Sequence, residues 1–175
     1  MGLFKQIEKY KTPTRQFIEL YDNIMNNTSH CLLCGATGSG KSVLLNNCIL
    51  YTMNNNTPTT TKFIFFDPKR VELSQYKNTR YCLKFCTDIK DINNTMQSLI
   101  NLMNCRYAEM EKKGLKKSEE SQIIVIIDEL ADLLLGYNKE SKQFENMLVL
   151  LLQKARASNI KFVVATQQPS RQVLK

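Results

Sequence analysis

The sequence predicts an α/β fold in which a mostly parallel β-sheet is covered by helices on both faces. Short apolar runs typical of strands alternate with longer segments in which apolar residues recur every three or four positions. One run, Ile123–Ile127, consists entirely of β-branched residues, as in a strand that is buried on both faces. A glycine-rich loop at 35–40 joins a strand-like run to a helical one. With 175 residues, the chain has the length of a single domain.

In the amino-terminal half, the apolar pattern predicts a helix followed by a strand, a second helix and two further strands. The second helix follows the glycine-rich loop, an Asn/Thr-rich loop separates it from the next strand, and Asp67-Pro68 stops that strand. The expected bounds are about 14–25 for the first helix, 30–34 for the first strand, up to Met53 for the second helix, 54–61 for the loop, and 62–66 and 81–85 for the later strands.

In the carboxyl-terminal half, a long helix, a strand, a shorter helix and a last strand are expected. Asp88 is placed to cap the long helix, because an aspartate at this position can accept hydrogen bonds from free backbone N–H groups of the first turn. The apolar residues of this helix have a spacing that predicts core packing: Ile89, Ile92, Met96, Leu99, Met103, Tyr107 and Met110. A polar linker at 112–121, the strand at 123–127, a helix at about 142–157 and a strand at 160–166 follow.

Residues 35–42 read G-A-T-G-S-G-K-S, which is the pattern of a Walker A phosphate loop. The glycines allow the backbone to bend so that successive N–H groups and the start of the following helix point at phosphates. Lys41 is expected to reach the β- and γ-phosphates, and Ser42 is expected to bind Mg²⁺. The sequence therefore predicts a site for ATP and Mg²⁺ that is formed by Gly35, Ala36, Thr37, Gly38, Ser39, Gly40, Lys41, Ser42 and Val43.

Asp128 and Glu129 directly follow the β-branched run, as the acids of a Walker B strand do. In an open α/β sheet, ligands bind at the carboxyl ends of the strands, which is where these two side chains are expected. Asp128 is predicted to hold Mg²⁺ together with Ser42, and Glu129 is predicted to polarise the attacking water. The alternative is that the two acids only cap a following helix and stabilise its dipole.

The formal net charge of +8 is unevenly distributed, because no acidic residue follows Glu145 whereas five basic residues do. A basic flank of this kind is suited to nucleic-acid phosphates, with an affinity that depends on salt and not on base sequence. The alternative, which charge alone favours, is that Lys154 and Arg156 complement a helix end and that the other charges are ordinary solvated surface.

Composition argues against several other protein classes. No apolar stretch approaches the roughly 20 residues that cross a membrane, and the first residues lack the apolar core of a signal peptide, so a cytoplasmic location is expected. Cys31-x-x-Cys34 has the internal spacing of half a zinc site, but there is no second pair with that spacing and His30 is the only histidine. We therefore expect reduced cysteines in a strand and no metal there.

Six stretches of the sequence carry motifs in the same order as those of one family of ATPases. They are G-A-T-G-S-G-K-S-V at 35–43, D-P-K-R-V-E-L at 67–73 with Tyr76, R-Y-A-E-M at 106–110, D-E-L-A-D-L at 128–133, Q-K-A-R-A at 153–157 and A-T-Q-Q-P-S at 165–170. Over about residues 30 to 170, the chain thus resembles the motor core of the FtsK/SpoIIIE DNA translocases, within the HerA/FtsK group of RecA-like ring ATPases. The second and the last of these stretches are much narrower signatures than the Walker motifs.

The resemblance implies a RecA-like P-loop NTPase with a doubly wound sheet. It also implies an amino-terminal helical lead-in (1–29) and an ATPase core (30–175). Gln167 would contact the γ-phosphate or the attacking water, because an amide can donate to phosphate and accept from water at once. The alternative is that Gln167 is only a polar residue directly after a strand, without a role in catalysis. With Lys41 and Glu129, Gln167 completes the predicted catalytic residues.

The same likeness places Asp67, Lys69 and Glu72 near the nucleotide or a subunit interface. From the residues alone, Asp67-Pro68 could equally be a strand stop with turn-favouring residues.

The resemblance further implies double-stranded DNA as a partner and a ring of identical subunits that couples ATP hydrolysis to DNA movement. Two departures from the family pattern qualify this expectation. Gln168 stands where the family usually has Arg, and the sequence ends at Lys175, before the family's segment with a trans-acting arginine and DNA-contacting loops. A truncated core is therefore expected. The other reading is a module that binds ATP or a full-length partner without efficient turnover.

Overall fold

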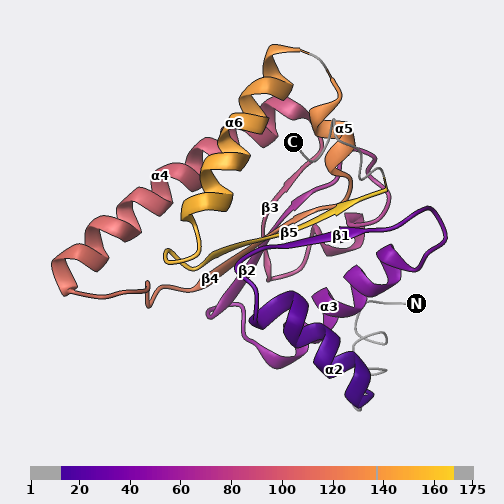
Figure 1. Cartoon of the computed structure of the whole chain (residues 1–175), viewed down its shortest axis with the longest axis horizontal. Coiled ribbons are helices and arrows are strands. Elements are labelled where there is room, and N and C mark those ends of the chain that lie inside the picture. The colour runs from indigo at the N-terminus through magenta and orange to yellow at the C-terminus, as the bar shows by residue number, and fades with distance from the viewer. Residues whose placement is uncertain (1–12, 137, 168–175) are drawn as a thin grey trace.

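The computed structural model describes residues 13–136 and 138–167, and this part of the chain contains one sheet of five parallel strands (Figure 1). The spatial order of the strands is β1-β5-β4-β2-β3. Their bounds are β1 Cys31–Cys34, β2 Thr61–Phe66, β3 Cys82–Cys86, β4 Gln122–Ile127 and β5 Ile160–Thr166. The predicted α/β fold with a parallel sheet is confirmed.

Helices cover both faces of this sheet, as a doubly wound fold requires (Figure 1). α3 packs on one face with α2 and the π-helical turn η1, whereas α4, α5 and α6 pack on the other. The bounds are α2 Arg15–Tyr21, η1 Asp22–Asn26, α3 Lys41–Asn55, the 3₁₀ turn η2 Ser74–Tyr76, α4 Ile89–Lys113, α5 Leu130–Leu134 and α6 Lys139–Lys154. Within the described ranges, no helix combines the length and the apolarity needed to cross a membrane.

Strand β4 shows why its sequence is continuously apolar. Ile124 and Ile126 are buried in the cluster on the α3 face, and Ile123, Val125 and Ile127 are buried in the cluster on the α4 and α6 face. Successive side chains of a strand point to opposite faces, so a central strand covered on both sides needs an apolar residue at every position.

The strand registers bring the carboxyl ends of four strands to one edge of the sheet. Cys34 at the end of β1 pairs with Thr166 at the end of β5, and Ile127 at the end of β4 pairs with Phe66 at the end of β2. β5 lies between β1 and β4. The segments that follow these strands therefore share one edge, where the glycine-rich loop lies beside the residues that follow β4 and β5.

Helix caps explain where α4 and α6 begin, the first as predicted and the second three residues earlier than predicted. Asp88 caps α4 as predicted, because its side chain accepts hydrogen bonds from two backbone N–H groups of the first turn. The Asn138 side chain accepts a hydrogen bond from Ser141 N, so α6 begins at Lys139 and not near Lys142. Sequence reasoning did not predict α5, because a helix of five residues is too short for apolar periodicity to show.

The division of the chain at residue 30 stays a prediction. Tyr21, Ile24 and Met25 precede that boundary, yet they are buried in the same cluster as Cys48 and Ile49 of α3. In the described part of the lead-in, these side chains thus belong to the hydrophobic core of the sheet and do not form a separate layer.

Candidate active site

The glycine-rich loop between β1 and α3 has the backbone shape that a phosphate loop requires. Gly38 and Gly40 have φ values of 81° and 89°, in the left-handed region that favours glycine. A Cβ on either residue would meet no neighbouring heavy atom within 4 Å, so space is open beside both. Gly40 directly precedes α3, a helix of 15 residues that presents the positive end of its dipole here. The loop therefore fits a polyphosphate.

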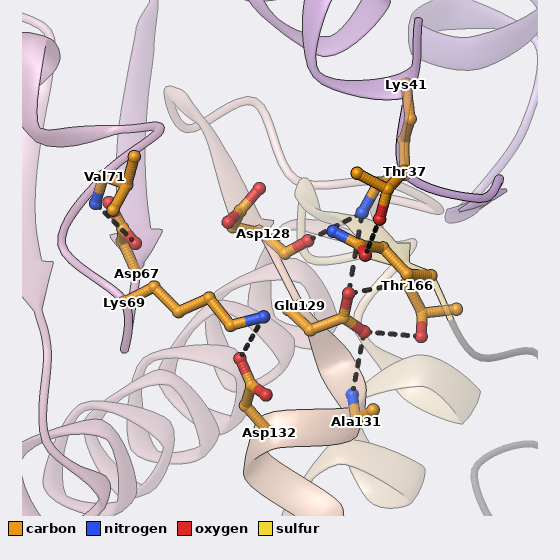
Figure 2. Close-up of polar contacts among 11 residues, drawn as sticks. Thr37, Lys41, Asp67, Lys69, Val71, Asp128, Glu129, Ala131, Asp132 and Thr166 are labelled. Carbon is orange, nitrogen blue, oxygen red and sulfur yellow. Dashed lines mark hydrogen bonds and ion pairs between the residues drawn. The ribbon is translucent and has the colours of Figure 1, made fainter. Parts of the chain in front are cut away.

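Lys41 crosses from the phosphate loop to the end of β4. It is the first residue of α3, and its side chain is only 7% exposed. Its Nζ donates a hydrogen bond to the backbone O of Asp128 (3.3 Å) and lies 3.8 Å from Oε2 of Glu129. The ammonium group thus lies between the two Walker motifs (Figure 2). The structure brings the predicted phosphate-binding lysine and the predicted catalytic acid into direct contact.

Glu129 connects three segments at this edge. Its Oε1 accepts hydrogen bonds from the Thr166 hydroxyl (2.6 Å) and from Ala131 N (3.3 Å), and its Oε2 accepts one from Gln167 N (2.9 Å). Because the side chain is buried, these bonds fix the orientation of the carboxylate. The capping interpretation is partly correct, since Glu129 is the N-cap of α5. A cap alone does not require the contacts with Lys41 and β5.

Gln167 follows β5 and contacts the phosphate loop. Its Oε1 accepts a hydrogen bond from the Thr37 hydroxyl (2.7 Å), while its backbone N–H is bound to Glu129. The backbone O of Thr166 accepts a further bond from Gly35 N at the start of the loop (3.2 Å). The end of β5 therefore bridges the phosphate loop and the carboxylate of Glu129.

Of the two predicted Mg²⁺ ligands, Asp128 lies in an acidic environment, and Ser42 is the second residue of α3. Burial and then the negative charge of Asp67 raise the pKa of Asp128 to about 6, against the lowering effect of Lys41. Crowded carboxylates of this kind favour a bound cation. In the described ranges, no group of three or more His, Cys, Asp or Glu side chains is arranged to hold a metal alone. Mg²⁺ is usually bound through one or two protein ligands plus phosphates and water, and a carboxylate such as that of Asp128 and a hydroxyl such as that of Ser42 are suitable oxygen ligands.

Asp67, which begins the D-P-K-R-V-E-L stretch, has a structural role. It is fully buried, and its carboxylate accepts hydrogen bonds from Leu73 N (3.0 Å) and Val71 N (3.4 Å), which close the segment into a loop after β2. Lys69 in that loop forms an ion pair with Asp132 of α5 (3.2 Å; Figure 2). Asp67 is therefore more than a strand stop, since it orders the loop that is tied to the helix after Glu129.

The R-Y-A-E-M stretch on α4 lies at the opposite edge of the sheet. Arg106 is buried and donates hydrogen bonds to the backbone O of Ser158 (2.7 Å) and of Ser121 (2.9 Å), just before β5 and β4. The Tyr107 hydroxyl donates to the backbone O of Lys154 at the end of α6 (2.6 Å). This motif holds the amino ends of the two strands whose other ends carry the acids and the amide.

Sequence reasoning missed Thr166 as a residue of this site. Apart from Lys161, it is the only polar residue of β5, and the available signal was a hydroxyl at the carboxyl end of an otherwise apolar strand. Three residues of interest for the family comparison, Gln168, Arg171 and Lys175, lie outside the described residues.

Comparison with known sequences identifies relatives of the chain. The family model described as "FtsK/SpoIIIE family" matches residues 14–122 and 116–171. The "DNA translocase FtsK" of Streptococcus pyogenes serotype M3 is 36% identical over 165 residues, which cover 83% of this chain and 20% of that protein. The "DNA translocase FtsK" of Streptococcus pneumoniae is 33% identical over 197 residues, which cover 95% and 25%. The chain therefore spans about a fifth to a quarter of the length of these curated relatives.

Solved structures share the fold. The pCW3 conjugation coupling protein TcpA, solved in a monomer form with ATPγS, matches with a TM-score of 0.73 and 27% identity over 86% of this chain and 46% of that one. EssC (ATPases 2 and 3) from Geobacillus thermodenitrificans matches with a TM-score of 0.72 over 83% of this chain and 30% of that one, and its identity of 19% shows the fold alone. The predicted P-loop ATPase fold is confirmed. From these matches and its motifs, the chain belongs to the FtsK/SpoIIIE family.

Proposed function

We propose that this chain is the ATP-binding and ATP-hydrolysing motor core of a double-stranded DNA translocase. The observation that carries the proposal is the contact between Lys41 of the phosphate loop and Glu129 after β4, at one edge of a parallel sheet. The family match and the relatives named as DNA translocases support DNA as the partner. Assembly into a ring of identical subunits is part of the same proposal and rests on the resemblance.

In this proposal, the backbone N–H groups of residues 35–43 and the start of α3 bind the phosphates of ATP, and Lys41 supplies the positive charge. Mg²⁺ held by Ser42 and Asp128 would neutralise phosphate charge and orient the phosphates. The acids near Asp128 and the left-handed glycines of the loop support this assignment.

Glu129 is proposed to polarise the attacking water and accept its proton. The bonds from Thr166 and from Gln167 N orient the carboxylate before the reaction, which avoids an entropic cost during it. Since the carbonyl oxygen of the Gln167 side chain accepts from Thr37, its NH₂ group is the part that would donate to the γ-phosphate.

A second candidate function is a nucleotide-binding module without efficient turnover. The observation in its favour is that both oxygens of Glu129 accept hydrogen bonds from within the chain. These bonds occupy three of the four lone pairs of the carboxylate, which leaves a single acceptor position, on Oε2, for the proton of a water.

Replacing Lys41 by Ala tests nucleotide binding. We expect at least a tenfold loss of Mg·ATP affinity, about 1.4 kcal/mol, in a titration with a fluorescent ATP analogue, because Lys41 is the only cation of the loop sequence. Lys90→Ala, which removes an exposed lysine of α4, is the matched control and should bind within about twofold of wild type. If folded Lys41→Ala protein also bound within that range, the phosphate-loop assignment would be wrong.

A further inference from the structure

A cavity of about 470 Å³ lies at the edge of the sheet opposite the phosphate loop. Its lining comes from the segment before β1, the linker before β4 and the turn between α6 and β5. These segments lead into the amino ends of parallel strands, whereas the phosphate loop follows a carboxyl end. The two sites are thus separated by the length of a strand, roughly 20 Å.

Positive charge from three separate segments gathers around this cavity, and none of the described lining residues is acidic. Two of the cations come from the linker before β4, two from the end of α6 and the turn after it, and one from β5 itself. They are Lys116, Lys117, Lys154, Arg156 and Lys161. We call this site the basic cavity.

Lys161 contributes a positive charge that hydrogen bonds hold in one position in the basic cavity. Its side chain is buried, and its Nζ donates hydrogen bonds to the backbone O of Thr28 (2.6 Å) and to the Thr28 hydroxyl (3.3 Å). Burial lowers the pKa of Lys161 to about 8, so its ammonium group is still mostly charged at neutral pH. Burial, Lys161 and, more weakly, Arg156 lower the pKa of the nearby His30 to about 4. The charges at this edge therefore produce a positive potential that an anion would relieve.

The rest of the lining indicates which anion fits. The other polar residues carry amides and hydroxyls, which are typical contacts of phosphate and sugar groups: Asn26, Thr28, Ser29, Gln122, Gln153 and Asn159. Tyr107 is the one aromatic residue among the described lining residues, and its hydroxyl is bound to Lys154 O. A single strand of nucleic acid would need stacking platforms, and a small organic ligand would need a mostly apolar lining. The lining favours the backbone of a duplex over both.

We propose that the basic cavity binds the phosphate backbone of double-stranded DNA without reading its sequence. The proposal rests on the proposed function in taking DNA as the partner, and it adds a surface for that partner. β4 and β5 begin at the basic cavity, and Glu129 and Gln167 lie just after their other ends, so DNA and ATP would contact opposite ends of the same two strands.

The test is duplex binding by the double variant Lys117→Gln/Arg156→Gln, which removes one exposed cation from each of two walls. The matched control is Lys90→Gln/Lys139→Gln, which removes two exposed lysines at the starts of α4 and α6. Affinity for a short duplex of mixed sequence is measured by fluorescence anisotropy over a range of salt concentrations. For the basic-cavity variant, we expect about tenfold weaker binding and a slope of log K against log salt that is smaller by about two. The control should bind within about twofold of wild type.

Three results would overturn the proposal. The first is an equal loss of duplex affinity in both variants, which would mean that net charge alone matters. The others are tighter binding of single strands than of the duplex, and no duplex binding by the wild-type chain at low salt. If circular dichroism shows that the first variant is misfolded, Lys116→Gln/Lys154→Gln replaces it with the same expected loss. An ATP titration of the same samples and of Lys41→Ala separates the two proposals. If Lys41→Ala kept its ATP affinity while the basic-cavity variant lost DNA, nucleotide binding at the phosphate loop would be wrong and the basic cavity would stand.

Discussion

The hydrogen bond from the Thr166 hydroxyl is the shortest of the contacts that the Glu129 carboxylate makes, at 2.6 Å against 2.9 Å from Gln167 N and 3.3 Å from Ala131 N. Both partners are buried, so the bond is stronger than the same bond in water and fixes the direction of the carboxylate. We therefore expect Thr166 to act as a positioning residue through Glu129, without touching the nucleotide itself.

Replacing Thr166 by Val keeps the shape of the side chain and removes the hydroxyl. We expect kcat for ATP hydrolysis to fall about tenfold while KM changes less than about twofold, because the carboxylate loses its orientation and the phosphate loop keeps its residues. Thr166→Ser, which restores the hydroxyl, should recover most of the rate. Steady-state kinetics of the three proteins tests this. Wild-type turnover by the Val variant, or no rescue by the Ser variant, would show that the hydroxyl has only a structural role.

The separation of these residues along the chain explains what could be predicted at this scale. The phosphate loop and the Asp128-Glu129 pair are local motifs, so their order along the sequence was enough to place them together. Thr166 and Glu129 are 37 residues apart, and their contact depends on β5 lying beside β4, which no local pattern specifies. The ion pair between Lys69 and Asp132 could not be predicted either, because it joins two segments that only the sheet brings together.

Among the elements, α4 does more than cover the sheet, because Arg106 ties it to the segments that lead into β4 and β5. One guanidinium group donates to two backbone carbonyl oxygens from different connections, which a lysine could not match in geometry. The spacing of the apolar residues predicted that α4 is a core helix, and the buried side chains agree. It could not show that a charged residue on this helix is also buried.

Replacing Arg106 by Ala should destabilise the chain by about 3 kcal/mol, because two buried carbonyl oxygens lose their donor and a cavity remains. Arg15→Ala, which breaks an exposed ion pair with Glu19, is the control and should change stability by less than about 0.5 kcal/mol. Urea unfolding followed by circular dichroism measures both. An Arg106→Ala variant as stable as the control would mean that this arginine does not hold the strands.

In the molecule as a whole, the residues proposed to bind and hydrolyse ATP lie at one edge of the sheet, and the cations of the basic cavity lie at the opposite edge. The alternation of strands and helices predicted the parallel sheet, and with it the edge where the two Walker motifs meet. The basic cavity could not be predicted, because it combines cations of the linker after α4 with residues of β5 and of the segment before β1. Lys161 and Thr28, which contact each other there, are 133 residues apart in the sequence.

The central claim is that this chain binds ATP at the phosphate loop and hydrolyses it with Glu129. The most direct test compares Mg·ATP affinity with turnover in Glu129→Gln, which keeps the size of the side chain and removes its charge. We expect affinity within about threefold of wild type and turnover at least 100-fold slower, since general-base catalysis contributes roughly 10²–10⁴ in rate. Glu109→Gln, which changes a half-buried acid of α4 that pairs with Lys113, serves as the control and should hydrolyse ATP at the wild-type rate. Turnover by Glu129→Gln at the wild-type rate would contradict the account and leave Glu129 as only the cap of α5.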